Sequence, residues 1–255
     1  MQNYKYIFLV GNNFLNLFKK IKLENHLVIV SDSKLFLDTE LKNKYKLLLG
    51  KKVIFLKTYE LEKKFKKIKS DYLISLSWRN LISSKILDKI KIAINIHPAL
   101  LPYYKGYHPL PDVIKNKEKY HGITAHLITN KIDEGDIILQ KKFRINRFST
   151  IQSLQYIFDK NIIKFLREVL DILSKKSIQN HAFKIQNYKT KYFAKKRTPK
   201  DSEIKNIASL NDLFDFVRSC HSSRYPAFFK INNQKIYIKL SRNIERRKKN
   251  NPHDI

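Results

Sequence analysis

The sequence predicts an open α/β domain of Rossmann-like type, in which a mostly parallel sheet is covered by helices on both faces. Short runs of consecutive apolar residues recur through the first hundred residues, as is typical of strands buried on both faces. Stretches with the apolar spacing of a helix separate these runs. The chain has 255 residues, of which 43% are hydrophobic, so it can fill a substantial core.

The elements of the first half are predicted in a repeating order. The predicted buried strands are 6–10, 27–30, 53–56, 72–76 and 92–96. The predicted helices between them are 13–21, 60–67 and 84–89. A further strand at 122–128 is expected to lie beside strand 92–96 and to return the chain to the end of that strand.

The second half changes in character after Gln140. Residues 150–173 have the spacing of one long amphipathic helix, with Ser149 or Thr150 as its N-cap. A helix at 210–219 and a β-hairpin formed by 227–231 and 235–240 follow. We therefore expect three parts: a catalytic α/β domain over 1–180, a small C-terminal α+β module over 181–241, and a charged, disordered tail over 242–255.

The composition excludes several classes of protein. A single cysteine, Cys220, rules out an internal disulfide framework and a zinc site built from cysteines. The apolar run near the N-terminus is too short to span a membrane, and no signal-peptide cleavage site follows it, so we expect a cytoplasmic protein with no membrane partner. The net charge of +30 favours nucleic-acid binding at first sight. However, residues 92–140 hold five lysines and five acidic residues, so the excess charge lies outside the segment with the most distinctive motif.

That motif places an amide, an imidazole and a carboxylate where a fold can bring them together. Asn95 and His97 are two residues apart at a strand end, so their side chains share one side of the sheet. Pro98 then ends the strand, and Asp133 follows 36 residues after His97, next to Gly135. Three of the five glycines and four of the seven prolines fall between 95 and 140, which indicates shaped loops.

The chemistry of this set points to direct group transfer. No serine or cysteine lies close in sequence to act as a nucleophile, and His121 and His126 would point to opposite faces of a strand, which argues against a shared metal. Asn95 could donate to a developing oxyanion, His97 could carry a proton, and Asp133 could orient the imidazole or accept a proton from an incoming amine.

The segment resembles the 10-formyltetrahydrofolate-dependent formyltransferase family. The resemblance lies in Asn-x-His-Pro-x-Leu-Leu-Pro-x-Tyr-x-Gly over 95–106, in Gly-x-Thr-x-His over 122–126, and in Asp133 with Gly135. It implies that Asn95, His97 and Asp133 are catalytic and that N10-formyltetrahydrofolate is the formyl donor. It also implies that the pterin of the donor lies between two loops, whose candidate contacts are Trp78, Arg79, Asn80, Leu81, Thr129 and Asn130.

Within this family, the chain most resembles the enzymes that formylate dTDP-linked 3-amino- or 4-amino-dideoxyhexoses for surface polysaccharides such as O-antigens. The similarity rests on Tyr-x-Gly-x-His-Pro over 104–109, Arg-Thr-Pro-x-Asp-Ser over 197–202 and Tyr-Pro-Ala-Phe over 225–228. The candidate contacts to the sugar or its pyrophosphate are Asn12, Tyr104, Lys105 and His108. Lys105 suits a phosphate as a point charge, although a solvated loop lysine is the alternative.

Other functions remain open from the sequence. One alternative is a divergent methionyl-tRNA formyltransferase, although the basic loop after the second strand and the full-sized C-terminal domain of those enzymes are absent. Another is a non-catalytic, basic nucleic-acid-binding protein that keeps the fold. The resemblance does not fix the oligomeric state; a homodimer is one compatible assembly.

Overall fold

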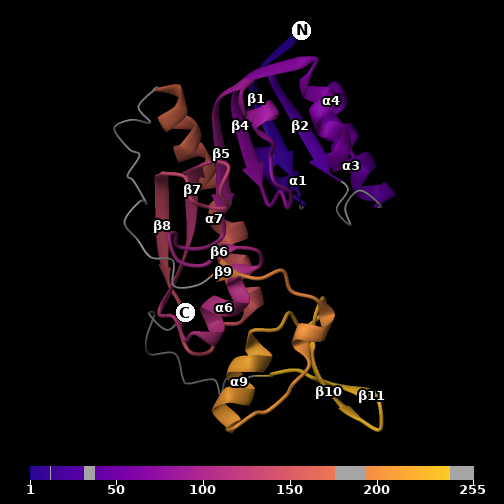
Figure 1. Cartoon of the computed structure of the whole chain (residues 1–255), viewed down its shortest axis with the longest axis vertical. Helices are drawn as coiled ribbons and strands as arrows, with labels where there is room; N and C mark the ends of the chain where they lie inside the picture. Colours follow the sequence, from indigo (N-terminus) through magenta and orange to yellow (C-terminus); the bar gives the residue numbers. More distant parts are fainter. Residues whose placement is uncertain (12, 32–37, 176–192, 242–255) are drawn as a thin grey trace, which may run out of the picture.

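A computed structural model describes residues 1–11, 13–31, 38–175 and 193–241. Its centre is a seven-stranded sheet with the order β3-β2-β1-β4-β5-β7-β8 (Figure 1). The strands are β1 (Gln2–Val10), β2 (His26–Ser31), β3 (Val53–Leu56), β4 (Ile68–Leu76), β5 (Ile90–His97), β7 (Tyr120–Leu127) and β8 (Ile137–Arg144). The first five pair in parallel, whereas β7 and β8 run antiparallel to their neighbours.

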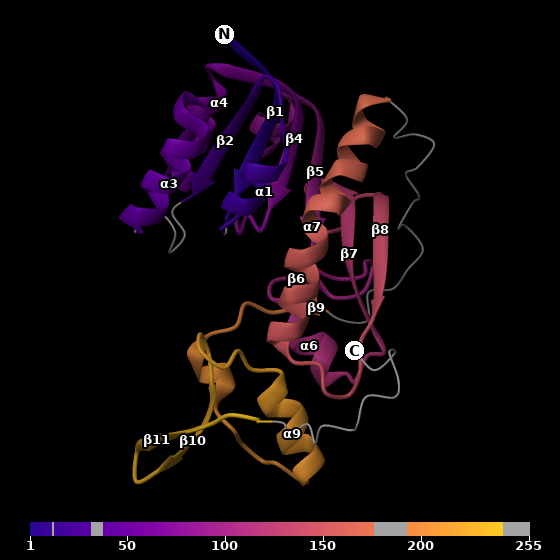
Figure 2. The ribbon, with the colours of Figure 1, turned by 180° about the vertical axis from the view of Figure 1, so that it is seen from behind.

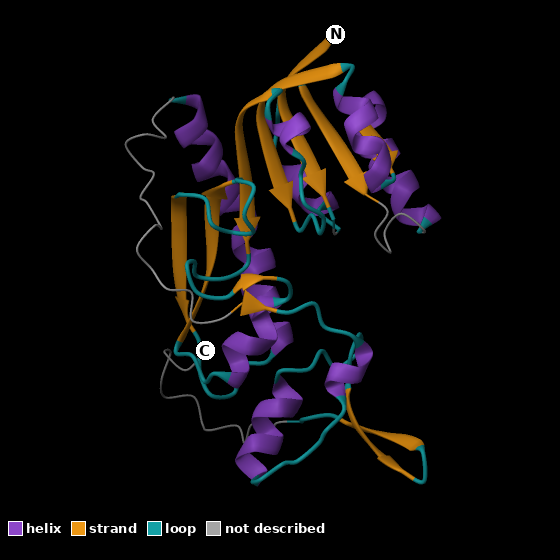
Figure 3. Cartoon of the chain, viewed as in Figure 1, coloured by secondary structure: helices purple, strands orange, loops and turns teal. Residues whose placement is uncertain are grey.

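Helices cover both faces of the sheet, as the sequence predicts (Figure 3). They are α1 (Leu15–Lys20), α3 (Thr39–Leu49), α4 (Leu61–Phe65), α5 (Ser84–Leu87), α6 (Pro109–Lys115) and α7 (Ile151–Ser174). Residues of α1, α3 and α7 share one core cluster with one face of the sheet, and residues of α4 and α5 share a second cluster with the other face. Figure 2 shows α7 lying across the half of the sheet that holds β5 and β7.

The start of α7 follows from its sequence. The Thr150 side chain accepts a hydrogen bond from Ser153 N, and the Ser153 side chain accepts one from Thr150 N, so each satisfies an N–H group that the helix leaves open. Of the two predicted caps, Thr150 is the one that caps the helix. Eight residues of its apolar face are buried, which anchors the strands that carry the site described below.

The prediction of an α/β fold with a small second module is confirmed, but several elements were not predicted, among them α3, α6 and β8. Helix α3 was not expected, because its apolar residues give only a weak amphipathic pattern and Leu41 and Tyr45 alone are buried. Helix α6 begins with two prolines, a composition that we interpreted as a loop. Strand β8 begins with buried apolar residues but contains lysines toward its end, so it lacks a continuous apolar run.

A small unit made of α9 (Leu210–Arg218) and the hairpin β10 (Ala227–Ile231) and β11 (Gln234–Ile238) lies at the far end of the molecule from the N-terminus (Figure 1). The loop of the hairpin is shorter than predicted. Asn232 and Asn233 both have positive φ, which gives a two-residue turn, so the second strand begins at Gln234. The predicted boundary at 180 and the predicted tail at 242–255 lie outside the described residues.

Arg218 attaches this unit to the main body. Its guanidinium contacts the Asp215 carboxylate and donates to the carbonyls of Ser149 and Ile114, which lie just before α7 and in α6. The side chain is only 4% exposed, so these hydrogen bonds are shielded from water. A second attachment is the parallel pair formed by β6 (Lys105–Gly106) and β9 (Phe193–Ala194). The module is thereby fixed against the segment that follows β5.

His121, near the start of β7, makes the stability of the fold sensitive to acid. The side chain is 1% exposed, and neither ring nitrogen has a hydrogen-bond partner in the part of the chain that the structure describes. Burial, with a smaller contribution from the charge of His97, lowers the pKa of His121 from 6.5 to about 4. The unfolded chain therefore binds this proton as the pH falls below 6.5, whereas the folded chain excludes it until about pH 4.

We expect the free energy of unfolding to fall by roughly 2 kcal/mol between pH 7.5 and pH 5 on account of this one group. Replacing His121 by leucine should remove that part of the pH dependence. Urea unfolding of both proteins at the two pH values measures it. Equal losses of stability in the wild type and in His121→Leu would contradict the assignment.

Candidate functional site

The candidate site lies where β5 ends against β7. Asn95 is paired with His126 and His97 with Thr124 across the two antiparallel strands. Paired residues share a face of the sheet, so the side chains of Asn95, His97 and His126 lie on the same side. The predicted common orientation of Asn95 and His97 is therefore observed, and the intervening Ile96 packs into the core cluster on the opposite face.

Asp133 reaches this face from the loop between β7 and β8. Its Oδ2 lies 3.4 Å from His97 Nδ1 and its Oδ1 lies 3.3 Å from Asn95 Nδ2. Oδ1 also lies 3.3 Å from His126 Nε2, and the backbone N–H of Gly106 donates to Oδ2 at 2.8 Å. The three residues that the sequence singled out thus meet at one point, and His126 joins them as a fourth member that sequence reasoning missed.

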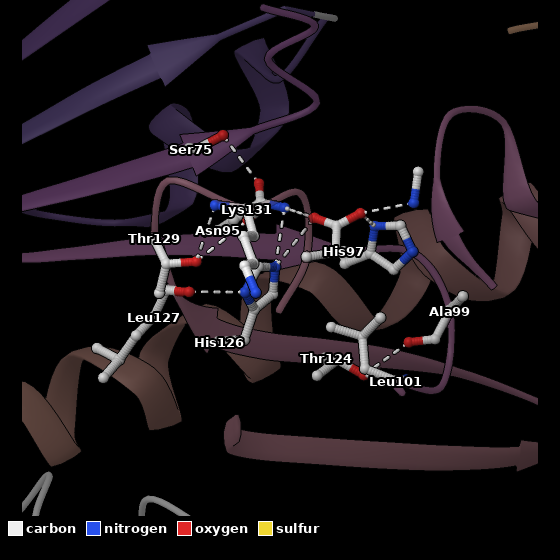
Figure 4. A network of polar contacts seen from close by, with 12 residues as sticks. Ser75, Asn95, His97, Ala99, Leu101, Thr124, His126, Leu127, Thr129 and Lys131 are labelled. Carbon is white, nitrogen blue, oxygen red and sulfur yellow. Dashed lines mark hydrogen bonds and ion pairs between the residues drawn. The ribbon is translucent and has the colours of Figure 1, made fainter. Parts of the chain in front are cut away.

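Each of the two histidines has one ring nitrogen within hydrogen-bond distance of a backbone carbonyl, and Figure 4 shows this for His126 and Leu127. His97 Nε2 lies 2.8 Å from the Tyr104 carbonyl, and His126 Nδ1 lies 2.8 Å from the Leu127 carbonyl. A carbonyl oxygen can only accept, so each of these nitrogens carries the ring proton. In the neutral rings, His97 Nδ1 and His126 Nε2 are consequently unprotonated, and both face Asp133.

The electrostatics leave His97 and Asp133 unprotonated at neutral pH. Burial holds the pKa of His97 below its usual value of 6.5, against the opposing effect of the Asp133 charge. Burial would raise the pKa of Asp133, but the charge that His97 and His126 carry when protonated, together with the Gly106 N–H, outweighs it and holds that pKa well below the usual range. At neutral pH, an ionised carboxylate therefore faces a neutral imidazole, and the site can take up a proton from a bound group.

Ser75 fixes the orientation of the Asn95 amide. Its hydroxyl, buried on β4, donates to Asn95 Oδ1 at 2.8 Å (Figure 4). The amide N–H groups of Asn95 are thereby directed toward Asp133 and His126. Ser75 is paired with Asn95 in the register of β4 and β5, a relation that a single sequence does not reveal. His126 could have been inferred from its place in the Gly-x-Thr-x-His segment.

A cavity of about 700 Å³ opens from this cluster. Its walls come from four segments: the loop after β4 (77–82), the loop after β7 (128–133), the segment around the start of α6 (107–111) together with the first two turns of α7, and the C-terminal module. The contribution of the module was not predicted. It supplies, among others, Arg197, His221, Arg224 and Tyr225.

The candidate donor contacts lie in the first two walls. Trp78, Arg79, Asn80, Leu81 and Thr129 line the cavity, whereas Asn130 is not among its lining residues. The indole N–H of Trp78 is buried and has no hydrogen-bond partner among the described residues.

The candidate acceptor contacts are more dispersed. His108 lines the cavity, and its Nδ1 accepts from Arg197 N at 3.2 Å. Tyr104 and Lys105 are buried behind the wall: the Tyr104 hydroxyl donates to the Glu118 carboxylate, and Lys105 pairs with Glu134. Asn12 lies outside the described residues. The roles of all these residues remain predictions.

The described residues hold neither a metal site nor a membrane-spanning helix. They contain no group of three His, Cys, Asp or Glu side chains placed to hold a metal ion. None of the helices that the structure describes is long and apolar enough to cross a membrane.

Comparison with known proteins places the chain in a family. Residues 55–170, which include the whole candidate cluster, match the formyl transferase family. The bifunctional polymyxin resistance protein ArnA of Wigglesworthia glossinidia brevipalpis is 33% identical over 173 residues, 68% of this chain and 26% of that protein. The methionyl-tRNA formyltransferase of Mycoplasma mycoides is 30% identical over 238 residues, 89% of this chain and 63% of that protein. The chain thus spans less than two thirds of the length of both relatives.

A solved structure extends the likeness to the whole fold. The N-formyltransferase from Helicobacter canadensis, in complex with folinic acid and dTDP-3-aminofucose, superimposes with a TM-score of 0.70. The match covers 91% of this chain and 86% of that one, at 22% identity, and so shows a shared fold. The match over residues 55–170 places this part of the chain in the formyl transferase family.

Proposed function

We propose that the protein transfers a formyl group from N10-formyltetrahydrofolate to the amino group of a nucleotide-linked amino-dideoxy sugar. The observation that carries this proposal is the Asp133 carboxylate placed between ring nitrogens of His97 and His126, beside the Asn95 amide and at the end of a cavity. An amine that attacks a carbonyl group must lose a proton, and this cluster is built to accept one. The Ser75 hydroxyl, which contacts this cluster, is engaged with Asn95 Oδ1.

Each residue of the cluster would have its own role in such a transfer. Asn95, held by Ser75, would donate an amide N–H to the negative charge that develops on the transferred carbonyl oxygen. His97 would take the proton of the attacking amine at Nδ1, because Nε2 is committed to the Tyr104 carbonyl. Asp133 would stabilise the resulting imidazolium from 3.4 Å and attract the amine to the site.

The first two walls of the cavity fit the donor, which supplies the activated formyl group when bound. A pterin is flat, with a polar edge and an apolar face. The 77–82 and 128–133 loops offer Trp78, Leu81, Ile82, Ile128 and Ile132 beside backbone groups. The unpartnered Trp78 N–H is available to a polar ligand atom.

The charge of the cavity as a whole fits an anionic acceptor. Four permanently cationic side chains line the cavity: Arg79, Lys131, Arg197 and Arg224. Asp133 is the one acidic side chain among the described lining residues. A cavity with this balance attracts phosphates, and Tyr107 and Tyr225 give aromatic surface against which a base can pack. The complex of the Helicobacter canadensis relative with dTDP-3-aminofucose supports the same class of acceptor.

A methionyl-tRNA formyltransferase is the second candidate, and the similarity to the Mycoplasma mycoides enzyme favours it. The high basic charge of the chain would serve either this function or plain nucleic-acid binding. These alternatives predict tight tRNA binding that weakens steeply as salt is raised.

A panel of acceptors tests the proposal. The purified protein should be given N10-formyltetrahydrofolate with dTDP-linked 3-amino- and 4-amino-dideoxyhexoses, the corresponding UDP-sugars, and methionyl-tRNA. We expect formylation of at least one dTDP-amino sugar and no formylation of the tRNA. Turnover of methionyl-tRNA alone would overturn the choice of acceptor, and no turnover of any amine would overturn the activity.

Replacing Asn95 by alanine should reduce kcat by a factor of about 10² to 10³, the range found when one oxyanion donor is removed. The acceptor KM should change little, because the amide contacts charge that exists only during the transfer. Steady-state kinetics with both substrates varied measures this. A change confined to KM would contradict the role.

We also propose that the protein is a homodimer formed through the β10–β11 hairpin. The hairpin forms a sheet of its own, and Ile231, Ile236 and Tyr237 are each more than 40% exposed on it. An isolated two-stranded hairpin is marginally stable, so a partner surface would stabilise it. The molar mass measured by light scattering decides between monomer and dimer.

A further inference from the structure

The turn that carries Asp133 is under strain. Asp133 has φ of +52°, a left-handed conformation that is unfavourable for a residue with a side chain. Two residues later, a Cβ on Gly135 would lie 1.8 Å from the Leu127 carbonyl oxygen, so the turn is pressed against the end of β7. A strained backbone persists only where its surroundings hold it, so contacts with other segments must keep this turn in place.

The segment 104–106 holds the turn and His97 at the same time. The Tyr104 carbonyl accepts from His97 Nε2, and Gly106 N donates to Asp133 Oδ2. Between these two backbone contacts, the Lys105 side chain extends to the Glu134 carboxylate, with Nζ 3.2 Å from Oε1. Tyr104, Lys105 and Gly106 therefore contact His97, Glu134 and Asp133, respectively.

The Lys105–Glu134 pair has the character of a structural contact. The Lys105 side chain is 5% exposed, although Glu134 is 41% exposed. Lys131 also approaches Glu134, but at 3.8 Å and with 71% of its side chain exposed, so it is a weaker partner. A buried ammonium group without its carboxylate would be costly, which makes the pair a firm link between the segment after β5 and the Asp133 turn.

We propose that Lys105 is a positioning residue, which acts through Glu134 to hold the Asp133 carboxylate against His97. This inference rests on the proposed formyl transfer, and it assigns Lys105 a role other than contact with a phosphate of the acceptor. Without the pair, the turn can relax toward an ordinary conformation, and Asp133 then moves away from His97. A displacement of about 1 Å in such a pair is enough to reduce a rate about 100-fold.

Lys105→Met and Glu134→Gln, each alone and combined, test the proposal kinetically. We expect each single variant to lower kcat by about 10- to 100-fold with the acceptor KM within about two-fold of the wild type. The double variant should be no worse than the single ones, because both remove the same link. Lys105→Arg should recover much of the rate. As a matched control, Lys91→Met breaks an exposed pair with Asp71, far along β5 from the site, and should leave both constants unchanged.

A second readout does not require turnover. The pH at which His97 takes up its proton can be followed from its ring nitrogens by NMR in each variant. Asp133 raises the pKa of His97, whereas the nearby His126 lowers it. If Lys105→Met lets Asp133 move away, the midpoint of His97 should shift to lower pH. Loss of the lysine charge alone would shift it to higher pH, so the sign separates positioning from a simple charge effect.

The outcomes distinguish the two proposals. A raised acceptor KM in Lys105→Met, without the same effect in Glu134→Gln, would identify Lys105 as a phosphate contact and overturn the positioning role. An unchanged kcat in Glu134→Gln together with an unshifted His97 midpoint in Lys105→Met would also overturn it. Failure of the wild type to formylate any acceptor would overturn the proposed function, while the NMR measurement would still decide the role of Lys105.

Discussion

Replacement of His97 by alanine is expected to lower kcat for formyl transfer by about 10²- to 10⁴-fold, the range that a positioned general base contributes. His97 is the residue whose unprotonated Nδ1 faces the carboxylate while Nε2 is held by the Tyr104 carbonyl. Without the ring, the attacking amine must give up its proton to water. The KM values should change far less than kcat, because most of the cavity wall is untouched.

The measurement is a steady-state assay at several pH values. Because burial lowers the pKa of His97, the wild-type rate should fall with acid only below pH 6.5, and this limb should be absent from the residual rate of His97→Ala. His26→Ala is a suitable control, since His26 is also buried but lies at the start of β2. Rates within a few-fold of the wild type in His97→Ala would refute the proton-transfer role.

The meeting of Asn95, His97 and Asp133 could be predicted because each step depends on local rules. Strand parity places Asn95 and His97 on one side, Pro98 ends the strand there, and Gly135 permits the close turn after Asp133. The structure adds the distances: the contact of Asp133 with His97 is only 0.1 Å longer than its contact with His126.

His126 and Ser75 could not be derived in the same way. Both reach Asn95 through strand pairing, and the register between strands depends on contacts distant in sequence. Lys105 shows a related limit. Its charge and its place in a loop suggested a phosphate contact, whereas Glu134, 29 residues away, is its observed partner. An ion pair between two loops leaves no periodic signal in the sequence.

The wall that the C-terminal module adds to the cavity was missed for a third reason. The prediction treated the module as an appendage, because its sequence shows only a helix and a hairpin. Arg197 and the buried Arg218 fix it against His108 and the α6–α7 region, which brings His221 and Arg224 to the cavity. The two loops that we assign to the donor could be anticipated from the sequence, whereas the proposed acceptor side is assembled from the start of α6, the start of α7 and the C-terminal module.

Replacing Asp133 by asparagine should have an effect of the same order as the loss of His97, with kcat lowered by about 10²- to 10⁴-fold. The fold should survive, because asparagine tolerates the left-handed conformation at this position and its oxygen can still accept from Gly106 N. The new amide N–H₂ would then take the place of Oδ1, next to His126 Nε2. The imidazolium that forms at His97 would lose the negative charge that stabilises it, which is the reason to expect a slow transfer.

The variant thus keeps the contact with Gly106 and places a donor beside His126 Nε2, and this is the reason to expect loss of activity with little loss of stability. In the wild type, the carboxylate stabilises a proton taken up by His97; in Asp133→Asn, no negative charge remains to do so. Unfolding midpoints of the two proteins, measured beside kcat, should therefore agree within a few degrees. Asp71→Asn, at an exposed pair remote from the cavity, controls for the loss of one negative charge. An active Asp133→Asn enzyme would show that the carboxylate only supports the turn, and the proton would then have to leave by another route.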